Sequence, residues 1–142
     1  MAWSGAHNRE LVAIVDDDES VRNAVHGVLR SIGLKTRTFS SAEEFLQSGT
    51  LAGAICLVTD VRMPGMDGIE LQRCIRLERP ELPVIFISAH HDDEIRQRAL
   101  DEGAVRFLYK PFDGAELLRA IEAALNDSPE DDPGVPNQFG KE

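Results

Sequence analysis

Short apolar runs alternate along the chain with longer segments whose apolar positions recur at helical spacing. Four of the runs are nearly continuous, which is typical of parallel strands buried on both faces: Leu11–Val15, Ala54–Val58, Val84–Ile87 and Val105–Tyr109. A fifth run, Lys35–Phe39, is more polar, and this favours a strand at the solvent-facing edge of a sheet. The pattern therefore predicts five strands.

A helical segment follows each predicted strand. Ser41 and Glu44 have the spacing of a capping box and predict the start of the second helix. The other four segments carry apolar stripes, the fourth being the thinnest: Val21, Ala24, Val25, Val28 and Ile32; Leu71, Cys74 and Ile75; Ile95 and Ala99; and Leu117, Leu118, Ile121, Ala124 and Leu125. This order predicts an α/β fold, a (βα)5 doubly wound parallel five-stranded sheet with the flavodoxin-like strand order 2-1-3-4-5.

The length of 142 residues fits one domain, which we expect at residues 10–126 after a flexible segment at 1–9. Residues 127–142 contain three prolines, five acidic residues and one lysine, so we interpret them as an acidic tail or a truncated linker. No apolar run approaches the ~20 residues that span a bilayer, and the start lacks the apolar core of a signal peptide. We expect a cytoplasmic protein without membrane contact.

The net charge limits the classes of partner, and the two cysteines indicate the redox state of the chain. The 25 acidic residues exceed the 15 basic ones, and the net charge of −10 argues against nucleic acid as a partner of this chain. The same charge favours cations or basic protein surfaces. The two cysteines, Cys56 in a predicted strand and Cys74 in a predicted helix, are expected to be reduced and buried rather than joined in a disulfide.

Polar side chains occur where four of the predicted strands end. Asp16 and Asp17 follow the first strand, Asp60 the third, Ser88 the fourth and Lys110 the fifth. Ligands of open parallel sheets bind beyond the carboxyl ends of the strands, so we expect these side chains to meet at one edge. A single aspartate there is usually a helix cap, but capping does not explain a set on four strand ends.

This set of side chains suits phosphoryl transfer. Crowded carboxylates repel each other, and Mg²⁺, which prefers oxygen ligands, offsets that repulsion. A carboxylate such as Asp60 can attack phosphorus and form an aspartyl phosphate. Transfer depends on positioning and neutralisation of charge, which Mg²⁺, Lys110 and either the Ser88 hydroxyl or nearby backbone N–H groups would supply. We interpret Asp18 as a helix cap or as a charge behind the metal ligands.

The chain from about Leu11 to Leu125 resembles the receiver (CheY-like) domain of two-component response regulators, with motifs similar to those of FixJ-type receivers. The resemblance lies in IVDDDES at 14–20, VTDVRMPGMDG at 58–68, VIFISAH at 84–90 and FLYKPF at 107–112. It implies that Asp60 is the phosphoacceptor and that Lys110 is the family's lysine. It implies Asp17 as a direct metal ligand, Asp16 as its acidic neighbour acting through water, and Arg62 as a ligand through its backbone carbonyl. Ser88 and Phe107 are implied as switch residues.

The resemblance implies a phosphoacceptor signalling domain that promotes its own phosphorylation and dephosphorylation, rather than an enzyme. The phosphoryl donor is then a sensor histidine kinase or a histidine phosphotransfer protein, and the cofactor is Mg²⁺. Inward movement of the Ser88 hydroxyl and rotation of Phe107 change the face of the fourth helix, fifth strand and fifth helix, where a homodimer is expected. Arg62 replaces the Asn of some receivers, and Phe107 lacks the hydroxyl of tyrosine.

The sequence disfavours three other interpretations. A Mg²⁺-dependent phosphohydrolase of the haloacid dehalogenase type needs a second acid two residues after the nucleophile, where this chain has Arg62. A degenerate receiver that accepts no phosphate is disfavoured because the key positions are filled. The run His90, His91, Asp92 and Asp93 is sequential rather than one helical turn apart, so a solvated loop with an aspartate cap is favoured over a transition-metal site.

Overall fold

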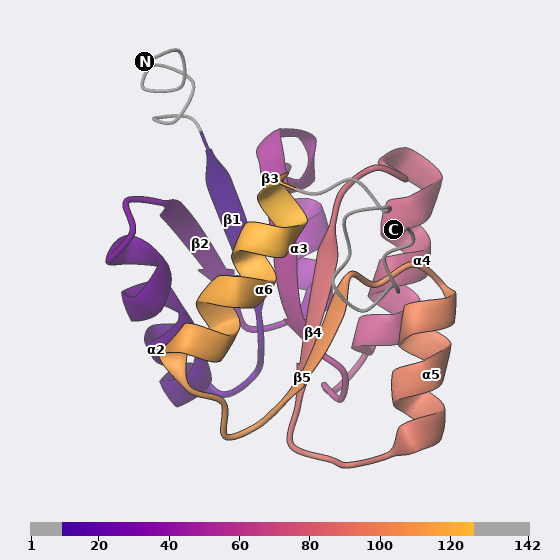
Figure 1. The fold of residues 1–142 in the computed structure, drawn as a ribbon. Coiled ribbons are helices and arrows are strands. Elements are labelled where there is room, and N and C mark those ends of the chain that lie inside the picture. The colour runs from indigo at the N-terminus through magenta and orange to yellow at the C-terminus, as the bar shows by residue number, and fades with distance from the viewer. Residues whose placement is uncertain (1–9, 127–142) are drawn as a thin grey trace, which may run out of the picture.

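The computed structural model describes residues 10–126 as a five-stranded parallel sheet with helices on both faces (Figure 1). The strand order is β2-β1-β3-β4-β5, which confirms the flavodoxin-like prediction. The strands are β1 (Leu11–Val15), β2 (Lys35–Phe39), β3 (Ala54–Asp60), β4 (Val84–Ser88) and β5 (Arg106–Tyr109). The predicted flexible segment at 1–9 and the predicted tail at 127–142 lie outside the described residues.

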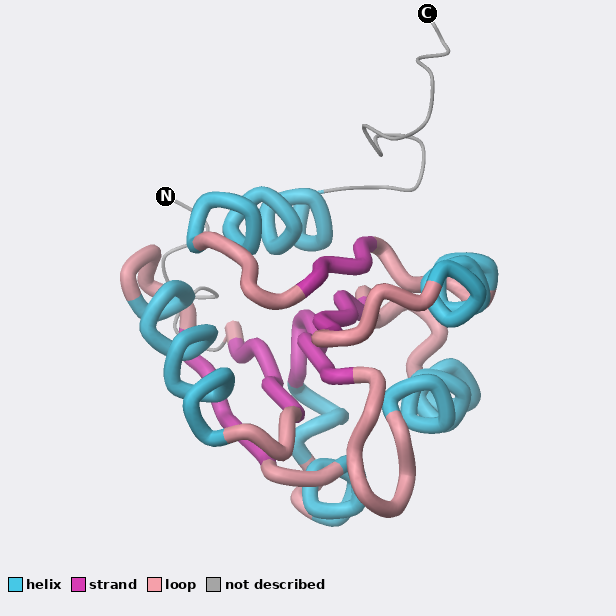
Figure 2. The backbone as a smooth tube through the Cα atoms, turned by 90° about the horizontal axis from the view of Figure 1, so that it is seen from below, coloured by secondary structure: helices cyan, strands magenta, loops and turns pink. Residues whose placement is uncertain are grey.

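Helices connect the strands and cover the sheet, as the view along the strands shows (Figure 2). They are α2 (Glu19–Arg30), α3 (Ala42–Gln47), α4 (Gly68–Glu78), α5 (Asp93–Asp101), α6 (Gly114–Asn126) and the short 3-10 helix η1 (Thr50–Gly53), which the sequence did not predict. Helices α2 and α6 share one buried cluster with the sheet, and α3, α4 and α5 share the other. None of the described helices is long and apolar enough to cross a bilayer.

Strand β1, which lies between β2 and β3, shows why both faces of the sheet are buried. Val12 and Ile14 belong to the cluster with α2 and α6, whereas Ala13 and Val15 belong to the cluster with α3, α4 and α5. Successive side chains of a strand point to opposite faces, so a continuous apolar run fills both clusters. The four residues are fully buried, which confirms the prediction from the run.

The predicted stripe of the first helix was wrong at two positions. Helix α2 ends at Arg30, so Ile32 lies in the following turn and is 42% exposed. Gly33, with φ of 86°, closes that turn in the left-handed region. Ala24 is also exposed, and the buried line of α2 runs through Val25 and Leu29, the latter of which we missed.

The helix caps agree with the sequence in part. Asp18 caps α2 by accepting a hydrogen bond from Ser20 N at 2.9 Å, and Asp92 caps α5, as predicted. Ser41 Oγ accepts from Glu44 N at 3.0 Å, but the Glu44 carboxylate bonds to Ser40 N, so the predicted reciprocal bond of the capping box goes to the preceding residue.

The two cysteines are free thiols, as expected. Cys56 is buried in β3, and burial raises its pKa to about 12. Cys74 lies on α4 and is only half-buried, so the expectation of burial is met by Cys56 alone.

Candidate functional site

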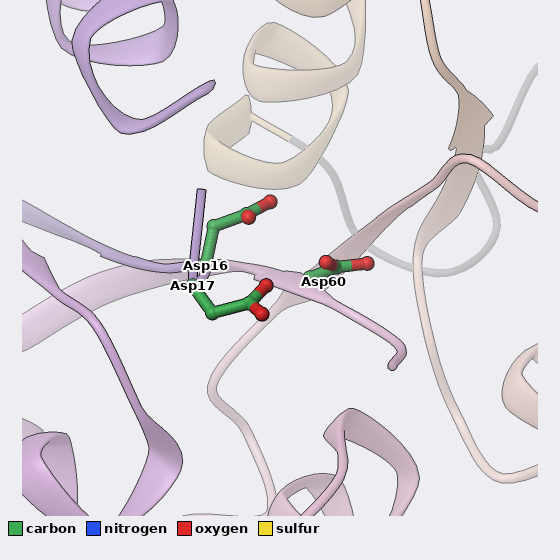
Figure 3. A group of neighbouring side chains, drawn as sticks. All are labelled: Asp16, Asp17 and Asp60. Carbon is green, nitrogen blue, oxygen red and sulfur yellow. The ribbon is translucent and has the colours of Figure 1, made fainter. Parts of the chain in front are cut away.

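Three carboxylates meet at the carboxyl edge of the sheet. Asp16 and Asp17 follow β1, and Asp60 is the last residue of the neighbouring strand β3 (Figure 3). The pairing of Val15 with Thr59 brings the three aspartates together across the two strands. One oxygen from each carboxylate lies within 4.8 Å of the others. The predicted convergence of these residues is thus present in the fold.

Lys110 brings its ammonium group to the same edge. Its Nζ donates to Asp60 Oδ2 at 3.3 Å and lies 3.1 Å from Asp16 Oδ2. The lysine follows β5 directly, and its backbone N donates to Ser88 O at 2.7 Å, which places it beside the end of β4. The peptide bond from Lys110 to Pro111 is cis. The Lys110 ammonium group therefore forms ion pairs with two buried carboxylates.

The carboxyl edge of the sheet carries an excess of negative charge, because Lys110 is shared between Asp16 and Asp60. The side chains of Asp16 and Asp60 are 0% and 10% exposed. Burial raises the pKa of both carboxyl groups, and the charge of Asp16 raises that of Asp60 further. Burial acts to lower the pKa of Lys110, but its contacts with Asp16 and Asp60 raise it overall. The charged form of Lys110 is stabilised by both carboxylates. Each carboxylate shares that single ammonium group with the other, so the cost of burying its negative charge is only partly offset.

The donor set fits a hard divalent cation. Asp16 Oδ1 accepts from Asp18 N at 2.9 Å, but Asp16 Oδ2 is buried without a hydrogen bond of acceptable geometry, despite its ion-pair contact with Lys110. Asp17 is exposed, so a cation bound there keeps access to water. Oxygen-only ligands with room for water are the environment that Mg²⁺ prefers. The residues present therefore fit the cation that the sequence predicted.

Ser88 and Phe107 lie on adjacent strands near this edge. Ser88 is 2% exposed, and its Oγ accepts from His90 N at 3.0 Å. Phe107 pairs with Phe86 in the sheet, and their ring centroids are 5.9 Å apart. Phe107 is half-buried, so its ring lies between the core and the solvent. Both predicted switch residues are thus within the elements that border the carboxylates.

The loop that follows Asp60 approaches the strand closely. A Cβ on Gly68 would lie 2.2 Å from Asp60 O, so only glycine fits this position. Gly68 N donates to Val61 O at 2.8 Å and closes the loop. The Arg62 side chain is directed to Asp92, with its guanidinium nitrogen 3.8 Å from that carboxylate. The arginine therefore links this loop to the start of α5.

Sequence reasoning missed one residue that contacts the site. Arg22 Nη1 donates to Asp16 O at 2.8 Å from the second turn of α2. The bond fixes the backbone between the two adjacent aspartates. In the sequence, Arg22 is one polar position on an amphipathic helix, and nothing in that pattern indicates a contact with the backbone.

Known proteins with similar sequences are response regulators. Residues 12–122 match the response regulator receiver domain family. The response regulator protein TodT of Pseudomonas putida is 42% identical over 126 residues, covering 89% of this chain and 56% of TodT. The transcriptional regulatory protein FixJ of Azorhizobium caulinodans is 39% identical over 119 residues, covering 84% of this chain and 56% of FixJ. The chain thus spans little more than half the length of these relatives.

Solved structures agree with this assignment. The response regulator StyR superposes with a TM-score of 0.75 at 44% identity, covering 82% of this chain and 59% of StyR. CheY4, a chemotaxis protein of Vibrio cholerae, superposes with a TM-score of 0.75 at 28% identity, covering 82% of this chain and 98% of CheY4. With the family match extending over most of the chain, the protein belongs to the response regulator receiver domain family.

Proposed function

We propose that this receiver domain accepts a phosphoryl group on Asp60, with Mg²⁺ bound, and relays the change through its surface. The proposal is carried by one observation. Side chains from three strand ends converge: Asp16, Asp17 and Asp60 each place an oxygen within 4.8 Å of the others, and Lys110 Nζ forms ion pairs with Asp16 and Asp60. The donor is a phosphohistidine on a sensor histidine kinase or on a histidine phosphotransfer protein.

The ligands proposed for Mg²⁺ are Asp17 and Asp60 directly, Asp16 through water and Arg62 through its backbone carbonyl. When bound, the cation neutralises charge on an oxygen of the phosphoryl group. Asp16 Oδ2, which has an ion-pair contact with Lys110 but no hydrogen bond, and the exposed Asp17 support this ligand set. A backbone carbonyl does not depend on the identity of its side chain, so arginine at position 62 is compatible with the role.

In the transfer, a carboxylate oxygen of Asp60 attacks the phosphorus in line with the histidine nitrogen. The new O–P bond forms as the P–N bond breaks, and the electron pair of that bond stays on the imidazole, which then takes up a proton. Lys110, already 3.3 Å from Asp60 Oδ2, is placed to contact a phosphoryl oxygen. Asp60 must be ionised to attack, and the Lys110 ammonium beside it opposes the effect of burial on the pKa of Asp60.

Phosphorylation would change the surface of the domain through Ser88 and Phe107. Ser88 Oγ now bonds to the backbone at His90, and a phosphoryl oxygen on Asp60 offers it a charged acceptor instead. Movement of Ser88 toward that oxygen leaves space for the ring of Phe107 to turn inward. The face formed by α5, β5 and α6 then differs between the two states, and a partner or a second copy binds one of them better.

An apolar groove beside the site supports docking of the phosphoryl donor. It has a volume of about 450 Å³ and lies between α2 and the segment after β5, lined by Ser20, Val21, Ala24, Lys110, Pro111 and Phe112. Ala24, which departs from the predicted core stripe, contributes to this groove. An apolar surface around a phosphohistidine would pack here and bring its phosphorus to the carboxyl edge.

Labelling with a small phosphoryl donor tests the proposal. The protein is incubated with acetyl phosphate and Mg²⁺, and its intact mass is measured. We expect the mass of one added phosphoryl group in the wild type and in Asp101→Asn, an exposed aspartate of α5. We expect none in Asp60→Asn or when Mg²⁺ is chelated. An unlabelled wild type would overturn the proposal and favour a receiver that accepts no phosphate.

A further inference from the structure

The carboxylate of Glu43 reaches across to the loop that follows Asp60. Glu43 lies in the first turn of α3, and its Oε2 accepts a hydrogen bond from Met66 N at 2.8 Å. A Cβ on the neighbouring Gly65 would lie 2.7 Å from the same oxygen, so the carboxylate lies directly against the loop backbone. Residues 43 and 66 are far apart in the sequence, and the bond joins two separate segments.

The loop at 61–67 is held differently at its base and at its outer part. At the base, Gly68 N bonds to Val61 O, and Val61 and Met63 are buried in the cluster that also contains residues of α3. The outer part, Pro64 to Met66, is more exposed than this base. There the Glu43 carboxylate supplies a charge-assisted hydrogen bond, which is among the stronger kinds.

Helix α3 is itself tied to the other half of the site. Only Ser40 and Ser41 separate it from β2, and Asp16 N donates to Phe39 O at the end of that strand at 3.1 Å. The segment that carries Asp16 and Asp17 is therefore bonded to the end of the strand that leads into α3. Through Met66, Glu43 connects this segment to the loop that carries Arg62.

We propose that Glu43 is a positioning residue for the Mg²⁺ site. Its carboxylate holds the outer part of the loop at 61–67, and with it the backbone that carries the Arg62 carbonyl. Glu43 acts through Met66 and is not part of the carboxylate group formed by Asp16, Asp17 and Asp60. The inference rests on the proposed function, because it assigns a role toward the cation proposed there.

The neighbouring Glu44 provides a matched control. It has the same charge, lies in the same turn and also accepts from a backbone N–H, that of Ser40 at 2.7 Å. Its bond closes the start of its own helix instead of reaching the loop. A purely structural contribution from acids at the start of α3 would therefore appear in variants of both residues, whereas an effect on the cation site would appear only in variants of Glu43.

Substitutions at position 43 separate hydrogen bonding from charge. Glu43→Gln keeps an acceptor oxygen at the same reach and loses only the charge. Glu43→Asp keeps the charge but is one methylene shorter, and Glu43→Ala removes both. If Glu43 positions the loop through Met66 N, binding of Mg²⁺ should be restored in part by glutamine and not by aspartate.

Two measurements on the full chain test the inference. Calorimetric titration with Mg²⁺ should give about tenfold weaker binding for Glu43→Ala and Glu43→Asp, the lower end of the effect of residues that orient metal ligands. We expect a smaller loss for Glu43→Gln and none for Glu44→Gln. Without Mg²⁺, hydrogen exchange of the Met66 amide should be faster in Glu43→Ala and unchanged in Glu44→Gln.

Equal Mg²⁺ affinity in the wild type and Glu43→Ala overturns the inference while leaving the proposed function intact. A similar loss in the Glu44 and Glu43 variants overturns it as well, because the effect would then belong to helix α3 as a whole. A wild type that binds no Mg²⁺ overturns both proposals together. Because Glu43 is exposed, we expect its variants to fold, and circular dichroism checks this.

Discussion

Lys110 Nζ and Asp60 Oδ2, which lie 50 residues apart in the chain, are separated by 3.3 Å at the carboxyl edge of the sheet. The same ammonium group lies 3.1 Å from Asp16 Oδ2. Both acids are buried, and burial raises the pKa of each. An edge with more buried negative than positive charge is less stable alone than with a divalent cation, and the stability of the protein should report this imbalance.

Removal of the lysine should make the protein depend on Mg²⁺ for stability. In Lys110→Ala, two buried carboxylates lose their cation, so we expect the free energy of unfolding to fall by about 2 kcal/mol at neutral pH without Mg²⁺. Mg²⁺ should then stabilise the variant more than the wild type, because no ammonium competes for the oxygens. Urea unfolding with and without Mg²⁺ measures this, with the exposed Lys35→Ala as control. An equal loss in both conditions would contradict the prediction.

Neutralising the phosphoacceptor should have the opposite effect. Asp60→Asn removes one buried charge, so we expect a gain of roughly 1 to 2 kcal/mol in the free energy of unfolding at neutral pH without Mg²⁺. Added Mg²⁺ should stabilise the variant less than the wild type, since one ligand has lost its charge. The experiment is the same urea titration. A variant less stable than the wild type without Mg²⁺ would show that the ion pair with Lys110 outweighs burial.

The raised pKa values also predict how stability varies with pH. A carboxyl group with a raised pKa binds protons more tightly in the folded state, so it stabilises the protein as pH falls from neutral through its folded pKa. Glu43 and Glu44 have lowered pKa values because backbone N–H groups donate to them, so their contribution is lost only below the ordinary carboxyl range of about 4.

Without Mg²⁺, the free energy of unfolding should therefore rise from neutral to mildly acidic pH and fall at lower pH. Saturating Mg²⁺ should flatten the rise, because the cation binds the ionised carboxylates. Thermal unfolding across this range, at constant ionic strength, measures the profile. A stability that falls steadily from neutral pH downward would show that the buried acids do not control it.

Two glycines should respond to alanine in opposite directions. In Gly68→Ala the new Cβ meets Asp60 O at 2.2 Å, so we expect a loss of about 3 kcal/mol together with slower labelling by acetyl phosphate. In Gly27→Ala the Cβ meets nothing within 4 Å on helix α2, so we expect a gain of about 0.5 to 1 kcal/mol. Tolerance of alanine at position 68 would mean that the loop is not held against the strand.

The fold was largely predictable, because continuous apolar runs in the sequence indicate strands that are buried on both faces. The bounds of β1 and β2 match the prediction, and β3 and β4 extend to the polar residues Asp60 and Ser88, which hydrophobicity alone excludes from a strand. The errors at Ala24 and Ile32 have a common cause. A helical stripe indicates a face but not where the helix ends or which side of that face borders a groove.

The site was predictable where topology decides it. The ends of parallel strands meet at one edge, so Asp60 and Lys110 could be brought together from their places in the pattern alone. The bond from Glu43 to Met66 N was not predictable, because Glu43 appears in the sequence only as one of two acids at a helix start. Arg22 was missed for the same reason, since its partner is a backbone carbonyl that no sequence pattern marks.

The most direct measurement is to locate the phosphoryl group on the chain. Protein labelled with acetyl phosphate and Mg²⁺ is treated with borohydride, which reduces an aspartyl phosphate to homoserine, and is then digested and sequenced by mass spectrometry. We expect homoserine at position 60 and aspartate at positions 16, 17 and 18. Homoserine at any other aspartate, with position 60 unmodified, would contradict it.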